Sequence, residues 1–439
     1  MLRVNPKEIN PGDTFLTLPG DEEEKNKNIE DAIDKGAVCI ITDKGEYEVK
    51  TIITNDTKTY LSNYLKELYY EKIEKIKLIG IVGTTGKTIT EDLIAQMLNN
   101  LNSKTAYLNE QEFYIDDYKK EIKLDIYKVY ECINKAIDEN CDNIIIELPS
   151  NLIKERQFEG LRFDIVVYTN LIDDNPSEEY INTKIEPFKM IKKDGYAIIN
   201  KNDKYYDKFV FPQNNNIYFG TEDSNYKISN INLKYDSIEF LINNQKIELK
   251  MLGSYNIYNY LAAYITAKAL KYDDEDILES TKKINQVKGT FYGIKHKDSL
   301  VIIDSAKKFK QISSIIKYTK EFSIGRIITI IGCEGDKNKE ERPKIGKLVT
   351  QNTDYVIFTS DNPRYEEEAN IINEMIKDVN GDNYEIITNR KEAIKKGISI
   401  LKERDILLLL GKGNEEYQII GNDKLTFSDY KEVRKHVKK

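Results

Sequence analysis

The feature that most constrains the fold of this chain is the segment 80–88, which reads Gly-Ile-Val-Gly-Thr-Thr-Gly-Lys-Thr. A short β-branched run at 78–82 leads into it, and a stretch with helical spacing from Lys87 to about Asn99 leads out. A strand, a glycine-rich turn and a helix in this order are typical of a phosphate-binding loop, because glycines let backbone N–H groups approach phosphate oxygens and the helix N-terminus favours negative charge. The segment therefore predicts a nucleotide-binding loop on a parallel α/β sheet.

The residues around the last glycine give this loop its chemistry. Lys87 supplies a positive charge to the phosphates, and the Thr88 hydroxyl can ligate Mg²⁺. The strict G-x-x-x-x-G-K-T pattern would place a glycine where this chain has Ile81, so the remaining motif is G-T-x-G-K-T. An ordinary glycine turn before a helix is the alternative, and the order of lysine and threonine disfavours it. The predicted ATP-binding residues of the loop are Gly83, Thr84, Thr85, Gly86, Lys87 and Thr88.

Composition excludes several classes of protein. The 439 residues carry 66 Lys and Arg against 74 Asp and Glu, a net charge of −8, which argues against a general nucleic-acid binder. No apolar run approaches the roughly 18–20 residues that cross a bilayer, and the start lacks the apolar core of a signal peptide. Four separated cysteines are typical of buried thiols in a reducing compartment. We expect a cytoplasmic monomer that acts on small molecules and has no nucleic-acid or membrane partner.

Strands alternate with helices along most of the chain, which predicts an α/β protein of three domains. We place a small α/β domain at 1–76, a central P-loop domain with a mainly parallel sheet at 77–287, and a doubly wound, Rossmann-like domain at 288–439. Short alternating runs between 210 and 250 predict antiparallel hairpins appended to the central sheet. Buried strands of the third domain are expected at 300–303, 326–332, 355–359, 384–387 and 406–410.

Further segments match, in order, the motifs of a known family. Together with the P-loop, these segments resemble the Mur ligases. Within that family they are most similar to the MurE type, the UDP-N-acetylmuramoyl-tripeptide synthetases. The chain looks like a divergent member of this type. The P-loop alone fits many NTPases, whereas Ser-Asp-Asn-Pro-Arg followed by Gly-Lys-Gly is specific. The segments that carry the resemblance are 11–15 (Pro-Gly-Asp-Thr-Phe), 169–171 (Thr-Asn-Leu), 179–184 (Glu-Tyr-Ile-Asn-Thr-Lys), 253–263 (Gly-Ser-Tyr-Asn-Ile-Tyr-Asn-Tyr-Leu-Ala-Ala), 359–364 (Thr-Ser-Asp-Asn-Pro-Arg) and 411–415 (Gly-Lys-Gly-Asn-Glu).

The resemblance implies ATP-dependent amide formation in the synthesis of peptidoglycan precursors. A substrate carboxylate attacks the γ-phosphate to give an acyl phosphate, and an incoming amino group then displaces phosphate. Because carboxylate and triphosphate are both anionic, their charge must be neutralised by Lys87 and Mg²⁺. The three domains would bind the UDP-sugar, ATP and the added amino acid respectively, and the substrates would be a UDP-N-acetylmuramoyl-dipeptide and meso-diaminopimelate.

The metal and catalytic residues follow from the same resemblance. Glu147, at the end of the apolar run 143–146, matches a metal-binding glutamate, and the alternative is a surface carboxylate. Lys184 matches a lysine that is carbamoylated and helps to hold a second Mg²⁺, and the alternative is a solvated helix lysine. Asn175 stands where the family has a metal-ligand histidine, and its carbonyl is a poorer ligand than the imidazole. Thr88 completes the predicted metal ligands.

Two further residues are placed near the nucleotide by the resemblance. Asp304, at the end of the apolar run 301–303, matches an aspartate near the nucleotide and the domain hinge, and we count it among the catalytic residues. Asn259 matches a residue on the adenine side. For both, a structural role in capping or turn formation is the alternative.

The segment 361–364 is predicted to bind the added amino acid. In the resembling enzymes an arginine here goes with meso-diaminopimelate, because a guanidinium grips the distal carboxylate that lysine lacks. Glu415 could pair with the distal ammonium of the same substrate. The alternative for 361–364 is a turn with a surface salt bridge. The predicted amino-acid-binding residues are Asp361, Asn362, Arg364, Gly411 and Glu415.

The chain departs from the family pattern at several positions. The arginine expected after Gly289 is Thr290, the histidine expected before Glu415 is Asn414, and the histidine of the segment after Asp304 is Lys307. The Thr-Thr-Pro segment that helps bind the muramoyl peptide is not visible around 123–126. Two alternatives therefore stay open: a ligase of the same chemistry with another carboxylate acceptor, and a non-catalytic relative that binds nucleotide. The intact P-loop and metal glutamate favour an enzyme.

Overall fold

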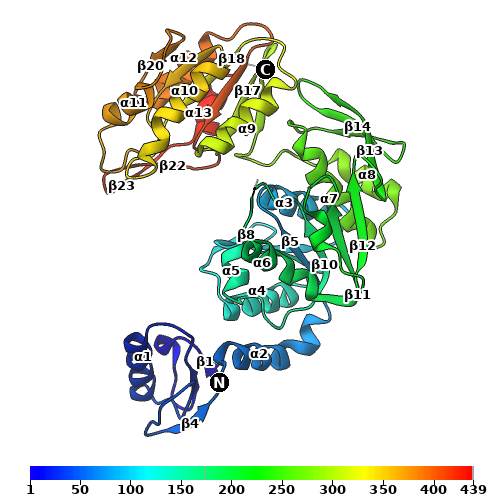
Figure 1. Cartoon of the computed structure of the whole chain (residues 1–439), viewed down its shortest axis with the longest axis vertical. Helices are drawn as coiled ribbons and strands as arrows, with labels where there is room; N and C mark the ends of the chain where they lie inside the picture. Colours follow the sequence, from blue (N-terminus) through cyan, green and yellow to red (C-terminus); the bar gives the residue numbers. More distant parts are fainter. Residues whose placement is uncertain (174, 438–439) are drawn as a thin grey trace. The chain divides into compact units, whose positions relative to one another are not determined.

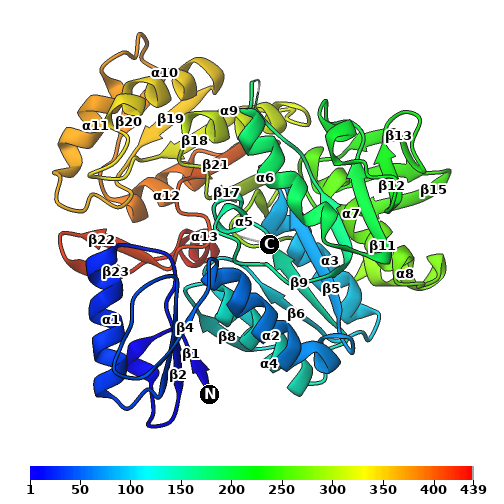
Figure 2. The same cartoon turned by 60° about the horizontal axis from the view of Figure 1, so that its bottom comes forward.

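The computed structural model describes residues 1–173 and 175–437, and it consists of three α/β domains with mainly parallel sheets (Figures 1 and 2). The predicted fold class is thereby confirmed, while the domain limits near 76 and 288 stay predictions. Contacts group the chain into two compact units, which are described separately. The first contains Met1–Glu91, Asn102–Ile199 and Asp203–Ile217, and the second contains Asp92–Leu101, Asn200–Asn202 and Tyr218–Lys439.

The N-terminal domain is built on four short parallel strands in the order β1-β2-β3-β4. Helix α1 begins at Glu22, because the Asp21 side chain caps it by accepting from the N–H groups of Glu23 and Glu24. Phe15, Ile29 and Ile40 form the buried core between this helix and the sheet. The elements are β1 Leu2–Arg3, η1 Pro6–Glu8, β2 Thr14–Leu16, α1 Glu22–Asp34, β3 Cys39–Thr42, β4 Lys50–Ile53 and α2 Thr57–Ile73.

The central sheet positions the P-loop. Its strand order in the first unit is β11-β10-β5-β9-β6-β7-β8, with β5 parallel to both β10 and β9, and Figure 2 shows β5, β9 and β6 next to one another. The carboxyl ends of these parallel strands therefore meet at one edge, where α/β proteins bind ligands. The elements are β5 Lys77–Val82, α3 Lys87–Asn100, β6 Thr105–Leu108, β7 Glu112–Ile115, β8 Tyr118–Glu121, α4 Ile126–Asp138, β9 Asn143–Glu147, α5 Ser150–Lys154, β10 Phe163–Tyr168, α6 Glu178–Lys189, β11 Ile191–Asn200 and η2 Tyr206–Phe209.

The strands between 210 and 250 are only partly the predicted antiparallel hairpins. β13 pairs with β14, and β14 with β15, in antiparallel fashion as expected. β12 instead pairs with β13 in parallel over two residues, so the prediction is wrong there. The connection lacks an Asn-Gly or Asp-Gly turn, and Asn225 Oδ1 accepts the Tyr218 N–H at 2.8 Å, which holds a wider loop. The elements are β12 Asn215–Gly220, β13 Tyr226–Leu233, β14 Ile238–Ile242, β15 Gln245–Leu249, α7 Tyr255–Ala269 and α8 Asp274–Lys282.

The C-terminal domain is the predicted doubly wound sheet. Its order is β16-β17-β21-β18-β19-β20, and every pairing is parallel except that of the edge strand β16. α9, α10 and α11 contribute to the core on one face, and α12 and α13 to the core on the other (Figure 1). The elements are β16 Tyr292–His296, β17 Ser299–Asp304, α9 Phe309–Lys320, β18 Ile327–Ile331, η3 Lys339–Glu341, α10 Arg342–Asn352, β19 Tyr355–Phe358, α11 Glu368–Ile376, β20 Tyr384–Ile386, α12 Arg390–Ser399, β21 Ile406–Leu410, β22 Tyr417–Ile420, β23 Asp423–Thr426 and α13 Asp429–His436.

Two expectations from composition can be compared with this fold. Three of the four cysteines, Cys39, Cys132 and Cys141, are buried as free thiols, and Cys333 is partly exposed. Across residues 1–173 and 175–437, none of the helices combines the length and the apolar character that a bilayer crossing requires.

Candidate active site

The loop between β5 and α3 requires glycine at two positions. Gly86 has φ +78°, a conformation that side chains with a Cβ rarely adopt. A Cβ on Gly83 would lie 1.9 Å from the Thr169 hydroxyl oxygen, so that position has no room for a side chain. Behind the loop, Thr169 Oγ1 donates to the Thr85 carbonyl at 2.9 Å, and the Thr85 N–H donates to Asn170 Oδ1 at 3.0 Å. The loop is therefore held against the end of β10.

Lys87, Thr88 and Glu147 lie together where β5 and β9 end. Lys87 Nζ is 3.4 Å from Glu147 Oε1, and Thr88 Oγ1 donates to Glu147 Oε2 at 3.2 Å. Both the lysine and the glutamate side chains are mostly buried, which disfavours an unpaired surface carboxylate at Glu147. The hydroxyl and the carboxylate oxygens together suit a hard cation such as Mg²⁺, which takes few protein ligands and completes its shell with water and phosphate.

Lys184 is a buried lysine beside the loop. Its residue is only 2% exposed, Nζ donates to the Gly83 carbonyl at 2.7 Å, and Nζ lies 4.8 Å from the centre of the Tyr180 ring. Burial, followed by repulsion from Lys87, lowers the pKa of Lys184 to about 7. The alternative of a solvated helix lysine is therefore wrong, because α6 packs this side chain under the P-loop.

Among the described residues, Asn175 forms no hydrogen bond or ion pair with the other predicted metal ligands. Asn175 lies on the exposed segment before α6, where its backbone N–H donates to Asp173 at 3.2 Å. No group of three or more His, Cys, Asp or Glu in the described residues is arranged to hold a metal ion. The roles of Thr88, Glu147, Asn175 and Lys184 as metal ligands stay predictions.

Asp304 and Asn259 are both buried and make contacts of a structural kind. The Asp304 carboxylate accepts the backbone N–H groups of Phe291 and Ala306, each at 2.7 Å, and burial raises its pKa to about 6. Asn259 lies in α7, and its side-chain amide donates to Asn256 Oδ1 at 3.0 Å. Their predicted roles near the nucleotide stay predictions.

A charged cluster lies at the strand ends of the C-terminal domain, with Asn362 at its centre. The Asn362 amide donates to Glu415 Oε2 at 3.0 Å and to Glu334 Oε1 at 3.3 Å. Its carbonyl oxygen accepts from Lys412 Nζ at 2.9 Å. Lys307 Nζ is 3.0 Å from Glu334 Oε1 and 2.5 Å from Glu415 Oε1. Segments far apart in sequence therefore converge on one polar site.

Arg364 lies at the margin of this cluster with part of its guanidinium available. Its φ is +53°, and its backbone N–H donates to the Ile419 carbonyl at 3.1 Å. Arg364 Nη2 forms a long ion pair with Glu334 Oε1, at 3.9 Å. Its Nε is buried and has no hydrogen-bond partner among the residues that the structure describes. Such a guanidinium is suited to grip a carboxylate from outside the chain.

Asp361 is buried beneath the cluster. Its side chain and that of Lys412 are both 0% exposed, and Lys412 Nζ lies 3.2 Å from Asp361 Oδ1. Gly411, with φ +113°, follows β21 here, and a Cβ on it would lie 2.5 Å from Asp361 Oδ2. The visible role of Asp361 and Gly411 is thus to position the loops, and a substrate contact for either stays a prediction.

Several residues of both sites were not among the predicted site residues, although most of them lie in segments that carry the family resemblance. Thr169, Asn170 and Tyr180 support the P-loop, and Lys307 and Glu334 complete the C-terminal cluster. The signal for Thr169 and Asn170 was their position directly after a buried parallel strand, and Glu334 likewise follows β18 closely.

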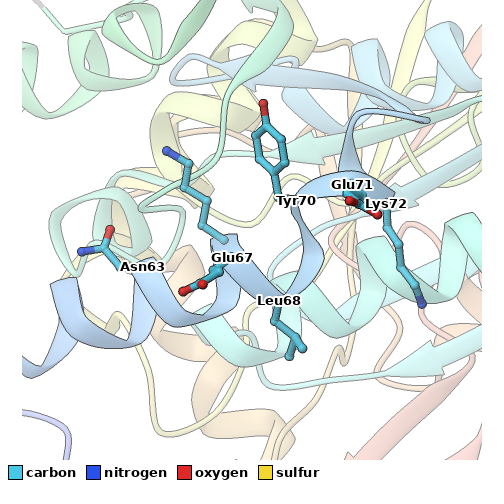
Figure 3. Close-up of a pocket in the computed structure, with 7 residues that line it drawn as sticks. Asn63, Glu67, Leu68, Tyr70, Glu71 and Lys72 are labelled. Atoms are coloured by element: carbon cyan, nitrogen blue, oxygen red, sulfur yellow. The ribbon is translucent and has the colours of Figure 1, made fainter.

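Figure 3 shows a hollow on the surface of α2 that contains none of the predicted site residues. Its lining comes from this one helix and mixes both signs of charge with apolar side chains, so it lacks the convergent polar groups of a catalytic site. The lining residues are Asn63, Lys66, Glu67, Leu68, Tyr70, Glu71 and Lys72.

The chain has a small α/β domain, then a P-loop on a parallel sheet, then a Rossmann-like domain with a charged cluster at its strand ends. This order defines a three-domain P-loop α/β protein. The family description "Mur ligase middle domain" matches residues 81–267, and "Mur ligase, glutamate ligase domain" matches residues 291–413. The chain belongs to the Mur ligase family, and it is accordingly an ATP-dependent ligase. The predicted resemblance is confirmed.

Relatives match over the full length. A UDP-N-acetylmuramoyl-L-alanyl-D-glutamate--2,6-diaminopimelate ligase of Clostridium perfringens is 30% identical, over 98% of this chain and 93% of the relative. A ligase of the same name in Clostridium acetobutylicum is 28% identical, over 100% and 94%. A solved structure of a ligase of this name has TM-score 0.79 at 22% identity, covering 99% and 94%. MurF ligase of Thermotoga maritima, solved with ADP, has TM-score 0.61 at 16% identity, covering 93% of each chain. These structures show the shared fold.

Proposed function

We propose that this chain joins meso-diaminopimelate to a UDP-N-acetylmuramoyl-dipeptide with ATP and Mg²⁺, as a cytoplasmic monomer in the synthesis of peptidoglycan precursors. The observation that carries the choice of amino acid is Arg364, whose buried Nε has no partner in the described chain and whose guanidinium borders the cluster around Asn362. The names of the full-length relatives support the same choice.

The P-loop site supports the ligation chemistry. Lys87, at the start of α3, brings a positive charge to the place where the helix N-terminus already favours phosphate. The substrate carboxylate forms a bond to the γ-phosphorus while the bond to the β-phosphate oxygen breaks, and the amino group then forms the amide as phosphate leaves and the nitrogen loses a proton. Mg²⁺, held by Thr88 and Glu147, would neutralise the charge of the triphosphate.

Phosphate release with a panel of acceptors and amino acids tests this proposal. Turnover that requires both UDP-N-acetylmuramoyl-dipeptide and meso-diaminopimelate supports it. Turnover with an unrelated carboxylate in place of the muramoyl peptide would establish the other-acceptor ligase instead. ATP binding without turnover across the panel would establish the non-catalytic relative.

Arg364→Ala is expected to lower kcat/KM for meso-diaminopimelate by about 10–100-fold and to leave the Kd for ATP unchanged, because the charge-assisted bonds to the distal carboxylate are lost. Alanine keeps a Cβ at φ +53°, so the backbone cost of that conformation stays the same. Steady-state kinetics and nucleotide titration measure the two quantities. Arg434→Ala, in α13, is the matched control. Equal losses for amino acid and ATP would mean that Arg364 acts structurally.

We further propose that Lys184 is carbamoylated. The neutral amine Nζ attacks the carbon of CO₂, a C–N bond forms, one proton leaves, and an anionic carbamate results. Because burial lowers the pKa of Lys184 to about 7, the neutral amine is abundant above that pH and scarce below it. The contact of Nζ with the Gly83 carbonyl places this group against the P-loop, where an anion could help to hold a cation.

The expected result is a carbamate resonance in ¹³C NMR of protein equilibrated with ¹³C-bicarbonate, rising between about pH 6 and pH 8. Lys184→Met should lack this resonance, whereas Lys189→Met, which removes an exposed lysine of the same helix, should keep it. An equal resonance in Lys184→Met, or its absence at every pH up to 9, would contradict the assignment.

A further inference from the structure

Glu334 and Glu415 form an anionic pair at the strand ends of the C-terminal domain, and Lys307 bridges them. Lys307 Nζ lies 3.0 Å from Glu334 Oε1 and 2.5 Å from Glu415 Oε1. Its side chain is 25% exposed, so it can be reached from solvent but is largely enclosed. Lys307 therefore sits where a cation from outside would have to bind in order to contact both carboxylates.

The hydrogen-bonding capacity of Glu415 is engaged by the protein itself. Its Oε1 accepts from Lys307, and its Oε2 accepts from the Asn362 amide at 3.0 Å and lies 3.5 Å from Lys412 Nζ. Glu334 Oε1 is shared between Lys307 and Asn362. An ammonium group on a substrate would have to displace Lys307 to make the contact that Glu415 was predicted to offer.

The cluster carries no excess of negative charge. Four cationic side chains face three carboxylates, because Lys337 Nζ also lies 3.4 Å from Glu334 Oε2. Burial works against the charge on Lys307, but Asp361 and Glu415 outweigh it and raise the pKa of the lysine, which keeps it protonated at neutral pH. A second ammonium would add an uncompensated positive charge unless it replaced that of Lys307. The cations of the cluster are Lys307, Lys337, Arg364 and Lys412, and its carboxylates are Glu334, Asp361 and Glu415.

Unlike the carboxylates of the cluster, the Arg364 guanidinium is not fully engaged by the protein. Its contact with Glu334 is long, at 3.9 Å, and its Nε is unpartnered in the described chain. The cluster can thus gain from a carboxylate at Arg364, whereas it has little to gain from a cation at Glu415. The cluster would therefore bind the carboxylate at the end of a zwitterionic side chain, and it would gain little from the ammonium of the same side chain.

We propose that the Lys307 ammonium takes the place of a substrate ammonium between Glu334 and Glu415, so that this site selects an amino acid by the carboxylate at the end of its side chain and not by a second amino group. Lys307 is then a specificity-determining residue, and the substrate class is that of α-amino acids with a distal carboxylate. The inference rests on the proposed function and narrows its amino-acid site.

The test compares kcat/KM for meso-diaminopimelate, 2-aminopimelate, which lacks the distal amino group, and lysine, which lacks the distal carboxylate. For the unaltered chain we expect the first two to agree within about threefold and lysine to be at least tenfold poorer, in line with the energy of charge-assisted bonds. In Lys307→Ala the freed carboxylates can accept a substrate ammonium. The preference for diaminopimelate over 2-aminopimelate should therefore rise about tenfold or more.

Two control variants separate charge from position. Lys307→Arg keeps a cation between the carboxylates and should keep the ratio of the unaltered chain. Lys310→Ala removes an exposed lysine three residues further along the chain, in α9, and should leave this ratio unchanged. If Lys307→Ala fails to fold, the inference is still tested in the unaltered chain and in Lys307→Arg. The quantity compared is the ratio of kcat/KM for diaminopimelate to kcat/KM for 2-aminopimelate.

A preference of the unaltered chain for diaminopimelate over 2-aminopimelate of more than about thirtyfold would overturn this inference and leave the proposed function standing, because Lys307 would then yield to the substrate ammonium. An unchanged ratio in folded Lys307→Ala would also overturn it. Turnover of neither amino acid, with phosphate release supported by another one, would overturn the proposed function and the inference together.

Discussion

Lys87→Ala is expected to lower kcat for ATP-dependent phosphate release by about 10²–10³-fold, the usual effect of removing one group that stabilises charge in a transition state. Lys87 is the cation that the structure places at the end of the P-loop, 3.4 Å from Glu147 and next to the start of α3. Without it, a carboxylate and a triphosphate must approach each other with less of their charge neutralised. Coupled phosphate-release kinetics at saturating ATP measure the effect.

The control for this variant is Lys75→Ala, which removes an exposed lysine just before β5 and should leave kcat unchanged. Circular dichroism of both variants should match that of the unaltered chain, because Lys87 lies at a loop edge and not in the core. Turnover by Lys87→Ala at the rate of the unaltered chain would reject the assignment of the loop as the nucleotide site.

Lys412→Met is expected to destabilise the C-terminal domain by about 3–5 kcal/mol, because it leaves the Asp361 carboxylate as an unpaired buried charge. Both side chains are fully buried, and Lys412 also donates to Asn362 Oδ1 and to the Tyr417 carbonyl, each at 2.9 Å. Hydrogen exchange of the buried β21 amides, measured in the full chain, reports the free energy of opening of this domain without requiring the whole chain to unfold in one step.

Replacing both partners, in Lys412→Met with Asp361→Leu, should recover most of the lost stability, since the carboxylate that lost its partner is then removed as well. The two variants together measure the coupling between the side chains. A loss as large in the double variant as in Lys412→Met would show that packing, and not the ion pair, sets the cost. A change below about 1 kcal/mol in Lys412→Met would show that water reaches Asp361.

Most of the secondary structure could be predicted because it depends on local pattern. The runs predicted as strands at 78–82 and 406–410 are strands within a residue at each end, and α3 begins at Lys87. The same holds for the P-loop turn, where Gly86 is required by its φ of +78°. The pairing of β12 could not be predicted, because the direction in which a short strand joins its neighbour depends on the loop that connects the two.

The candidate sites were only partly predictable. Glu147 could be identified because the end of a buried parallel strand is where ligands bind in this class of sheet. The burial of Lys184 could not be predicted, because its neighbours on the helix are exposed. Nothing in the local sequence indicates that this lysine packs under a loop a hundred residues earlier in the chain. The engagement of Asp304 by two backbone N–H groups was equally hidden.

The sequence alone determined the family, the P-loop and the alternation of strands and helices, because these depend on residues that are neighbours along the chain. Tertiary structure alone decided which charges meet: Lys307 reaches Glu334 and Glu415, and Lys412 reaches Asp361. The physical reason is that the interaction of charges depends on distance and burial in space, and the fold brings together side chains that lie tens of residues apart along the chain.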